Sequence, residues 1–189
     1  MNFKEAEAAG WKQSQPGDAF LKGRYLWNKG RSDDVVKSID KAGSMFAWIK
    51  TDILDYWGGI VNRGGVNDQY DDFGLWIARG NVGAWFNYPD NRKRLNSKGL
   101  IPSGKWTLVG VAWDERNATF YIDGKEDAVT PLTTAELPQR RTSRISIGSN
   151  PPGGQDPYNG LVGSVMIYNK PLTAPEASLL YLGTRLKFK

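Results

Sequence analysis

The 189-residue chain contains no cysteine and no histidine. Without cysteine it can form neither a disulfide framework nor a thiolate site. Without histidine it lacks the commonest general base and the commonest protein ligand of zinc and copper. The two absences exclude Ser-His-Asp, Cys-His and zinc-hydrolase chemistry.

The sequence also lacks long apolar stretches. No run of about 18 apolar residues is present, so we expect neither a transmembrane segment nor membrane insertion. The first twenty residues, MNFKEAEAAGWKQSQPGDAF, contain no apolar stretch of the signal-peptide kind. A chain that starts in this way is expected to stay in the cell that made it, or to leave by another route such as lysis.

Aromatic residues and glycine are abundant instead, with 8 Trp, 8 Tyr and 22 Gly. This combination favours strands and tight turns over helices. The formal net charge is +5, which favours anionic partners such as sulfated or acidic glycans or nucleic acid; the alternative is an ordinary soluble surface with a few extra lysines. No nucleic-acid-binding module is recognisable, and aromatic residues do not interleave with the basic clusters, so nucleic acid is not an expected partner.

From residue 33 onward the pattern predicts short strands separated by turns. The candidate strands are 33–40, 44–50, 58–64, 73–79, 82–88, 105–115, 118–124, 125–129, 144–150 and 161–169. Gly80-Asn81 and Asp123-Gly124 are hairpin signals, because such turns need residues that tolerate positive φ. Residues 89–99 and 131–143 are predicted to be loops. Alternation over 105–115 makes both faces of that strand partly apolar, which suits an inner strand of a sandwich.

In the C-terminal segment the spacing of the apolar residues changes from that of a strand to that of a helix. Thr173 and Glu176 have the spacing of a capping box, and the apolar residues after them predict a short helix that ends at Gly183. We therefore predict an all-β fold: a two-sheet antiparallel β-sandwich with one short C-terminal helix. Residues 1–30 do not share the strand pattern and are interpreted as an arm that lies on the domain or on a partner; a first strand with a frayed tip is the alternative.

The order of these elements resembles a known family. The matching stretches are SMFAWIK, GGIVNRG, FGLWIARGNVGAWFN, GKWTLVGVAWDERNATFYIDGKE, RISIGSN and NGLVGSVMIYNKPLTAPEASLLY, which together cover about residues 33–182. The chain resembles the laminin G-like, concanavalin A-like jelly rolls of the lectin and glucanase family. The resemblance implies a jelly-roll domain over residues 31–189. It implies no single function, because such domains bind sugars, proteins or steroids, or serve as structural modules.

Some relatives on this fold are glucan hydrolases, which need a pattern such as E-x-D-x-x-E with both carboxylates on one face of a strand. The acidic pairs of this chain are adjacent residues, which point to opposite faces of a strand. Asp52 and Asp55, three positions apart, fail the same test. The motif is absent, and we predict that the protein is not an enzyme.

Two loops are rich in the oxygen ligands that calcium prefers, 67–72 and 153–160. The resemblance implies that calcium can be held at such loop ends. Asp71, Asp72 and Asp156 are therefore the candidate metal ligands, if the two loops meet. The alternative is that these residues cap local N–H groups in ordinary polar turns.

A sugar-binding face would present exposed aromatic rings beside polar groups. Tyr70, Tyr88 and Tyr158 are the preferred candidates because they fall in polar loops, with Trp76 and Trp85 as further candidates. Trp48, Trp106 and Trp113 are assigned to the core. Basic residues that attract sulfates or phosphates gather in two loops, and the ligand-binding candidates among them are Arg92 and Arg94; the alternative is a solvated loop.

The sequence therefore predicts a non-catalytic recognition module that binds a glycan or cell-surface polysaccharide. Calcium is the one candidate cofactor. The resemblance implies a fold that is usually found outside cells, and together with a start that has no signal peptide it fits a location on a virion surface or outside the cell. Residues 1–30 would then dock onto a capsid or fibre protein. The alternative is a purely structural decoration or fibre protein of a bacteriophage particle with no sugar ligand.

Overall fold

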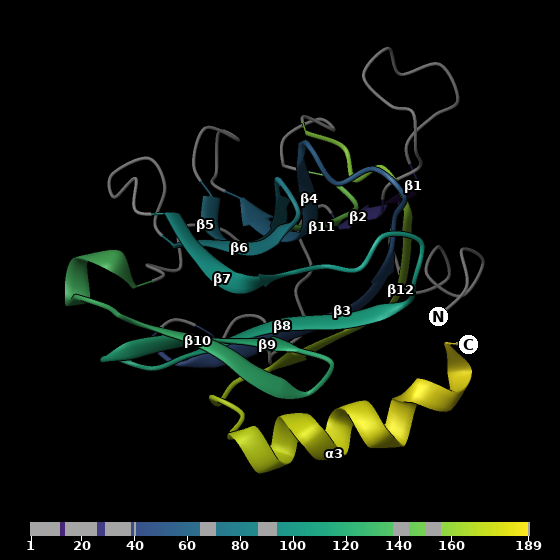
Figure 1. Ribbon diagram of the computed structural model, residues 1–189. Helices are drawn as coiled ribbons and strands as arrows, with labels where there is room; N and C mark the ends of the chain where they lie inside the picture. Colours follow the sequence, from purple (N-terminus) through teal and green to yellow (C-terminus); the bar gives the residue numbers. More distant parts are fainter. Residues whose placement is uncertain are drawn as a thin grey trace.

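The computed structural model describes residues 12–13, 26–28, 39, 41–64, 71–86, 94–137, 144–149 and 156–188. Within them the chain forms two sheets packed face to face (Figure 1). The seven-stranded sheet has the order β1 (Lys12–Gln13), β2 (Leu26–Asn28), β11 (Arg144–Ile147), β4 (Trp57–Gly64), β5 (Asp71–Ala78), β6 (Asn81–Phe86) and β7 (Arg94–Leu100). The five-stranded sheet has the order β10 (Lys125–Pro131), β9 (Asn117–Ile122), β8 (Thr107–Trp113), β3 (Gly43–Lys50) and β12 (Leu161–Tyr168). The predicted antiparallel sandwich is confirmed.

The core lies between the sheets and follows from two-residue alternation. In β3, Ala47 and Ile49 point into the core, whereas Phe46 and Trp48 point to the outer face of the five-stranded sheet. A strand with large apolar residues on both faces needs a cover on each side. The seven-stranded sheet covers one side of β3, and a helix covers the other.

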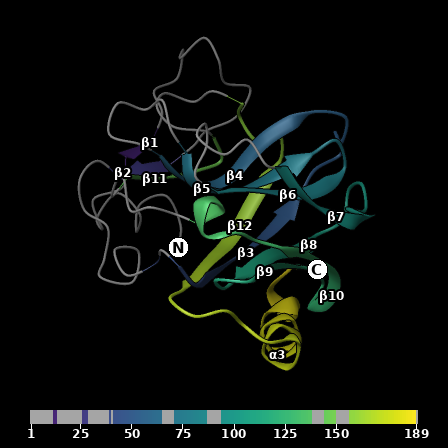
Figure 2. The same cartoon turned by 90° about the vertical axis from the view of Figure 1, so that its left-hand side faces the viewer.

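That helix is α3 (Ala174–Thr184), which continues as a 3₁₀ turn, η2 (Arg185–Lys187). Figures 1 and 2 show α3 lying under the five-stranded sheet, on the side away from the larger sheet. Leu172 and Ala177 complete a second apolar cluster there with Phe46, Trp48 and Tyr121. The jelly roll thus has one outer face that its own C-terminus occupies.

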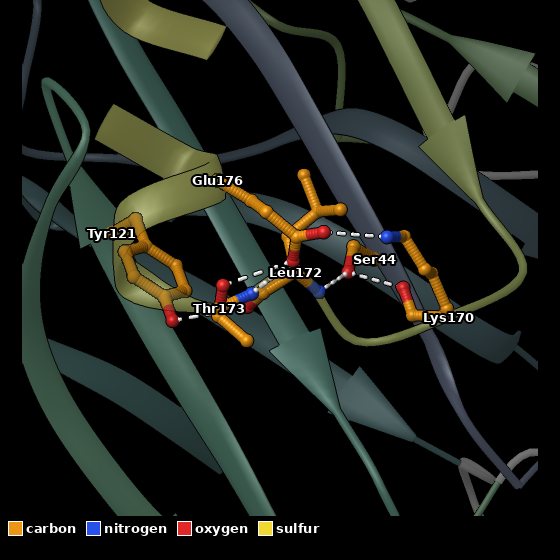
Figure 3. A network of polar contacts seen from close by, with 6 residues as sticks. All are labelled: Ser44, Tyr121, Lys170, Leu172, Thr173 and Glu176. Carbon is orange, nitrogen blue, oxygen red and sulfur yellow. Dashed lines mark hydrogen bonds and ion pairs between the residues drawn. The ribbon is translucent and has the colours of Figure 1, made fainter. Parts of the chain in front are cut away.

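Polar contacts fix the start of the helix to the sheet (Figure 3). The hydroxyl of Ser44 donates to the carbonyl of Lys170 at 2.7 Å and accepts from the N–H of Leu172 at 2.8 Å. The hydroxyl of Tyr121 donates to the carbonyl of Leu172 at 3.1 Å. These buried contacts satisfy backbone groups where the chain leaves β12, so the turn into α3 has a defined path.

The predicted capping box is present at the first turn of α3. The carboxylate of Glu176 accepts from the backbone N–H of Thr173 at 2.8 Å and from its hydroxyl at 3.0 Å, and it pairs with the ammonium group of Lys170 at 2.5 Å. The lysine and the two donors lower the pKa of Glu176 from 4.5 to about 2. The predicted end of the helix is wrong, because α3 runs through Gly183 to Thr184.

Three further details differ from the expectations. The first hairpin turns at Arg79 and Gly80, both with positive φ (52° and 87°), one position earlier than predicted, whereas the turn at Asp123 and Gly124 is confirmed (49° and 73°). Residues 94–99, which the sequence placed in the loop 89–99, belong to strand β7 (Arg94–Leu100). A 3₁₀ turn, η1 (Thr134–Glu136), lies in the predicted loop 131–143.

Part of the segment interpreted as an arm belongs to the sandwich. Leu26–Asn28 pairs with β11 at the edge of the seven-stranded sheet, and Lys12–Gln13 pairs with it in turn. This agrees with the alternative of an added strand for those residues. The remaining residues of 1–30, and the candidate strand 33–40 apart from Ile39, lie outside the described part of the chain.

Candidate functional site

The outer face of the seven-stranded sheet has a different character from the face that α3 covers. In β5 and β6 the core side is apolar and regular, formed by Phe73, Leu75, Ile77, Val82, Ala84 and Phe86. Strand alternation therefore turns Trp76 and Trp85 outward. Trp57 of β4 is opposite Ala78, on the same outward side. Three tryptophans thus lie on the outer face of this sheet.

Glycines make room for these large side chains. Trp76 is flanked in register by Gly59 on β4 and Gly83 on β6, and Trp85 is opposite Gly74 on β5. A side chain at a glycine position would meet an indole: an ideal Cβ on Gly74 would lie 2.2 Å from the Nε1 atom of Trp76. Glycine weakens a strand and marks places where another group approaches closely. Here that group is an indole.

The tryptophans contact one another. Trp76 and Trp85 stack with ring centroids 4.9 Å apart and an interplanar angle of 14°. Trp57 and Trp85 are 6.1 Å apart and tilted by 57°. Trp76 is buried at 1% exposure, whereas Trp57 and Trp85 are half-buried. The stack therefore has a buried base and a partly exposed upper part.

Arg94 completes the group from the first residue of β7. It is directly opposite Trp85 in the register. Its guanidinium carbon lies 4.5 Å from the ring centroid of Trp57 and 5.1 Å from that of Trp85. The side chain is exposed, and the described part of the chain offers it these two ring contacts and no ion pair. We call Trp57, Trp76, Trp85 and Arg94 the Trp–Arg cluster.

The contact with two indoles restricts where the guanidinium can lie. A guanidinium over an aromatic ring gains on the order of 0.5–1 kcal/mol at an exposed site. Its five N–H donors lie in its plane, so a ring on its face leaves donors free to bind a carboxylate or sulfate. The amide of Asn96, also exposed on β7, adds a neutral donor and acceptor beside this group. The cluster can therefore combine apolar contact with recognition of an anion.

Two buried polar atoms lie beneath the cluster. The Oδ1 atom of Asn62 and the Nε1 atom of Trp76 are both 2.2 Å from the ideal Cβ position of Gly74. Neither has a hydrogen-bond partner in the described part of the chain, although the Nδ2 atom of Asn62 donates to the carbonyl of Ser149 at 2.8 Å. One is an acceptor and the other a donor, so a single hydroxyl group or water molecule can satisfy both.

The predicted site residues are distributed as follows. Arg94 lies in the Trp–Arg cluster, on a strand and not in the predicted loop. Trp85, which the sequence ranked below the loop tyrosines, is the half-exposed centre of the cluster. Tyr70, Tyr88 and Arg92 lie outside the described residues, so their place in a site stays a prediction.

The expectation of an exposed ring at Tyr158 is wrong. The side chain is 3% exposed and packs 6.5 Å from the ring of Tyr56. Its backbone N–H donates to the carbonyl of Gly148, which draws the loop onto the sheet and buries the ring. Burial raises the pKa of the Tyr158 hydroxyl. Of the tryptophans assigned to the core, Trp48 and Trp113 are buried and Trp106 is partly buried against the second cluster.

The backbones of the candidate calcium ligands Asp156 and Asp71 lie at different levels of strand β4. The carbonyl of Asp156 accepts from the N–H of Gly59, whereas Asp71 pairs with Gly64. Five residues of strand separate these positions along β4, or about 16 Å at ~3.3 Å per residue. The placement of the Asp71 and Asp72 side chains lies outside the described structure, so a calcium site shared with Asp156 stays a prediction.

Calcium at either end remains a prediction. No group of three or more acidic side chains that could hold a metal ion occurs within the described residues.

The structure has no helix, in its described ranges, of the length and apolar character needed to cross a membrane.

The family of the chain follows from comparison with family models. Residues 30–178 match the model described as the concanavalin A-like lectin/glucanases superfamily, and the chain belongs to this family. The resemblance seen in the sequence is confirmed. A comparison with curated proteins found no significant match.

Solved structures share the fold at low sequence identity. The native heptameric SAP-like pentraxin from Limulus polyphemus matches with a TM-score of 0.60 and 16% identity, over 75% of this chain and 70% of that one. The CBM40 of the Ruminococcus gnavus IT-sialidase, bound to α2,3-sialyllactose, matches with 0.62 and 15%, over 76% and 84%. The binding domain of botulinum neurotoxin serotype D matches with 0.65 and 17%, over 88% of this chain and 41% of the toxin chain.

Proposed function

We propose that the protein is a non-catalytic module that binds an acidic glycan at the Trp–Arg cluster. The observation that carries the proposal is the position of Arg94. An exposed guanidinium rests on two half-exposed indoles and has no ion pair in the described part of the chain. A carboxylate or sulfate of a sugar supplies the partner that this group lacks.

The tryptophans give the apolar half of the site. Sugar rings have a hydrophobic face as well as hydroxyl groups, and a rigid indole surface offers contact area at low entropic cost. The stack of Trp85 on buried Trp76 fixes that surface before a ligand arrives. Preorganisation of this kind lowers the cost of binding.

Two further observations support an acidic ligand. The net charge of +5 attracts anions over the whole surface. The sialidase module of the same fold binds sialyllactose, an acidic glycan. At 15% identity that likeness concerns the fold, so the assignment of ligand rests on the residues of this chain.

The test compares acidic and neutral glycans on an array, followed by titration of the best ligand. Arg94→Gln is expected to weaken binding roughly 10-fold or more, the equivalent of about 1.5–3 kcal/mol for a hydrogen bond to a charged group. Arg116→Gln is the control: it removes the same charge from an exposed position between β8 and β9, on the other sheet. Trp85→Ala is expected to abolish binding.

A preference for neutral glycans, or equal effects of the two arginine variants, would refute the assignment. Equal effects would show that overall charge, not this cluster, attracts the ligand. The same array repeated with a chelator tests the calcium prediction. Loss of binding with chelator would link the predicted calcium to the ligand, and unchanged binding would leave the metal without a part in recognition.

We also propose display on a virion or similar particle as the setting of this activity. Because β1 and β2 are the two outermost strands at one edge of the seven-stranded sheet, removal of residues 1–30 would damage the sheet as well as any docking contact. Deletion of residues 1–25 keeps Leu26–Asn28, the strand that pairs with β11, and removes only the two-residue strand β1 from the described sheet, so it is the cleaner test. Loss of particle association with normal glycan binding supports docking through this segment, and full association of the deletion variant excludes it.

A further inference from the structure

The solvent side of α3, continued by the 3₁₀ turn η2 in which Leu186 lies, carries an apolar stripe. Leu179, Leu182 and Leu186 are exposed at 69%, 48% and 69%. Their spacing of three and four residues places them on one face of the helix. The opposite face of α3 already packs on the five-stranded sheet through Ala177, Leu180 and Tyr181. The stripe is therefore a second apolar face, which the described part of the chain does not cover.

Small, uncharged residues accompany the leucines. Gly183 is exposed in the helix, and a Cβ built on it meets no atom within 4 Å. Ser178 is exposed one position before Leu179. A glycine inside a helix costs roughly 1 kcal/mol relative to alanine, and it lets another backbone or side chain approach closely. Beside a leucine stripe, this is the surface that a second helix can pack on.

Charge along the same helix indicates the orientation of such a partner. Glu176, at the first turn, is ionised at neutral pH, and Arg185 and Lys187 are exposed at the other end. A parallel copy of α3 would place like charges side by side. An antiparallel copy separates the like charges and places the cations of each helix near the Glu176 carboxylate of the other, which also pairs with Lys170 of its own chain, and it aligns the helix dipoles favourably.

We propose that α3 is a homodimer interface in which two copies of this chain pair their helices antiparallel about a twofold axis beside Leu182. Glu176 lies six positions before Leu182 and Lys187 five positions after it, on the order of 9 Å and 8 Å along the helix. The two ends therefore fall at the same level across the axis. Leu179 of one copy, three positions before the axis, then lies level with Arg185 of the other, three positions after it and next to Leu186 of the stripe.

This pairing has a consequence for binding. The Trp–Arg cluster lies on the outer face of the seven-stranded sheet, and α3 lies beyond the five-stranded sheet, on the other side of the molecule (Figure 1). A dimer through α3 holds its two clusters at opposite ends, facing away from each other. Such a dimer links two glycan-bearing surfaces, and it does not bind one surface twice.

Sedimentation of the full chain over a range of concentrations, without glycan, tests the pairing. A mass rising towards twice the 21.1 kDa of one chain is expected. Leu179→Glu should return the protein to a monomer. Leu100→Glu is the matched control, because Leu100 is 67% exposed on β7 of the other sheet, and it should leave the dimer intact. A monomer at every concentration, or equal behaviour of the two variants, overturns the proposal.

Single cysteines test the orientation, since the chain has none of its own. Leu182→Cys lies beside the axis and should form an intermolecular disulfide on oxidation. In the antiparallel pair, two Leu186→Cys thiols lie about 12 Å apart along the axis, beyond the reach of a disulfide. Cross-linking at 186, or none at 182, overturns the antiparallel arrangement. Because both assays are free of glycan, they are independent of the proposed ligand.

Discussion

The C-terminal residues make an aromatic contact, and the stability lost when it is removed can be worked out from the structure. The ring of Phe188 stacks on Trp48 with centroids 4.7 Å apart and an interplanar angle of 17°, and it lies 5.0 Å from the ring of Trp106. It also covers Gly163, where an added Cβ would lie 2.4 Å from the Phe188 ring. Phe188 therefore holds the end of the chain against the outer face of the five-stranded sheet.

The perturbation is Phe188→Ala. Two aromatic contacts contribute roughly 0.5–1.5 kcal/mol each beyond the buried area. A fully buried phenylalanine replaced by alanine costs about 3–5 kcal/mol, but Phe188 is half-buried, so we expect a loss of about 2 kcal/mol. For a domain of this size, that loss lowers Tm by roughly 4–8 °C.

Thermal and urea unfolding followed by tryptophan fluorescence measure this loss, and Trp48 is itself a reporter because Phe188 covers its ring. Leu161→Ala is the control: its side chain is 58% exposed at the start of β12, outside the stripe on α3, and its removal should change the free energy of unfolding by less than about 0.5 kcal/mol. Unchanged stability of Phe188→Ala, or an equal loss in both variants, would show that the C-terminal contact contributes nothing to the fold.

Four other substitutions test three separate features. Gly74→Ala forces a methyl group to within 2.2 Å of the Oδ1 atom of buried Asn62 and should lower the free energy of unfolding by about 1–3 kcal/mol. Gly183→Ala has open space around it and should leave the free energy of unfolding of the single chain unchanged or raise it by up to ~1 kcal/mol. The urea midpoints of the two variants measure this difference. Tyr158→Phe removes a buried hydroxyl with no described partner and should leave Tm equal or higher; a large fall in Tm would reveal a hydrogen bond there. The variant Glu176→Gln should have a lower Tm than the unaltered protein above pH 4.5, and this difference should shrink as the pH falls from 4.5 towards 2. The reason is that the lowered pKa of Glu176 contributes stability that is present above pH 4.5 and is lost as the pH falls through about 2. A Tm difference that does not depend on pH would contradict the charge contacts of Glu176.

Much of the fold could be predicted because each central strand has a strong local pattern. Residues 44–50 and 107–113 alternate large and small apolar side chains, and they form β3 and β8 as expected. The turn at Asp123 and Gly124 has a residue pair that tolerates positive φ, and the turn adopts it. In such segments local propensity and tertiary packing agree.

Strand β7 shows where the pattern becomes too weak. Its sequence RLNSKGL alternates exposed and buried positions, but its apolar inward residue is Leu95, and Ser97 is buried as well. Pairing with β6 and hydrogen bonds supplied by Asp127 hold it in place, since the carboxylate accepts from the N–H groups of Lys98 and Gly99. An edge strand fixed by its neighbours carries little signal in its own residues.

The site was predicted in part, for a related reason. Arg94 was among the candidates, but the search for sugar-binding rings favoured tyrosines in polar loops, and Tyr158 proved to be buried. Polarity of a loop does not report whether the loop folds back onto a sheet. The residues that identify the face are the glycines within strands, Gly59, Gly74 and Gly83, because a strand accepts such residues where a large group lies across it.

The two outer faces of the sandwich differ in how their tryptophans are covered. Both sheets turn tryptophans outward, and a large exposed apolar face favours association. On the five-stranded sheet the chain covers Trp48 with Tyr181 and Phe188 from its own C-terminus. On the seven-stranded sheet the described part of the chain supplies Arg94 to the tryptophans, and this cation leaves its donors exposed. A face that needed only to be covered would be served by an apolar side chain, as the other face is. A cation held on two indoles instead leaves its donors open to a partner, and this supports the proposed ligand site at the Trp–Arg cluster over the covered face.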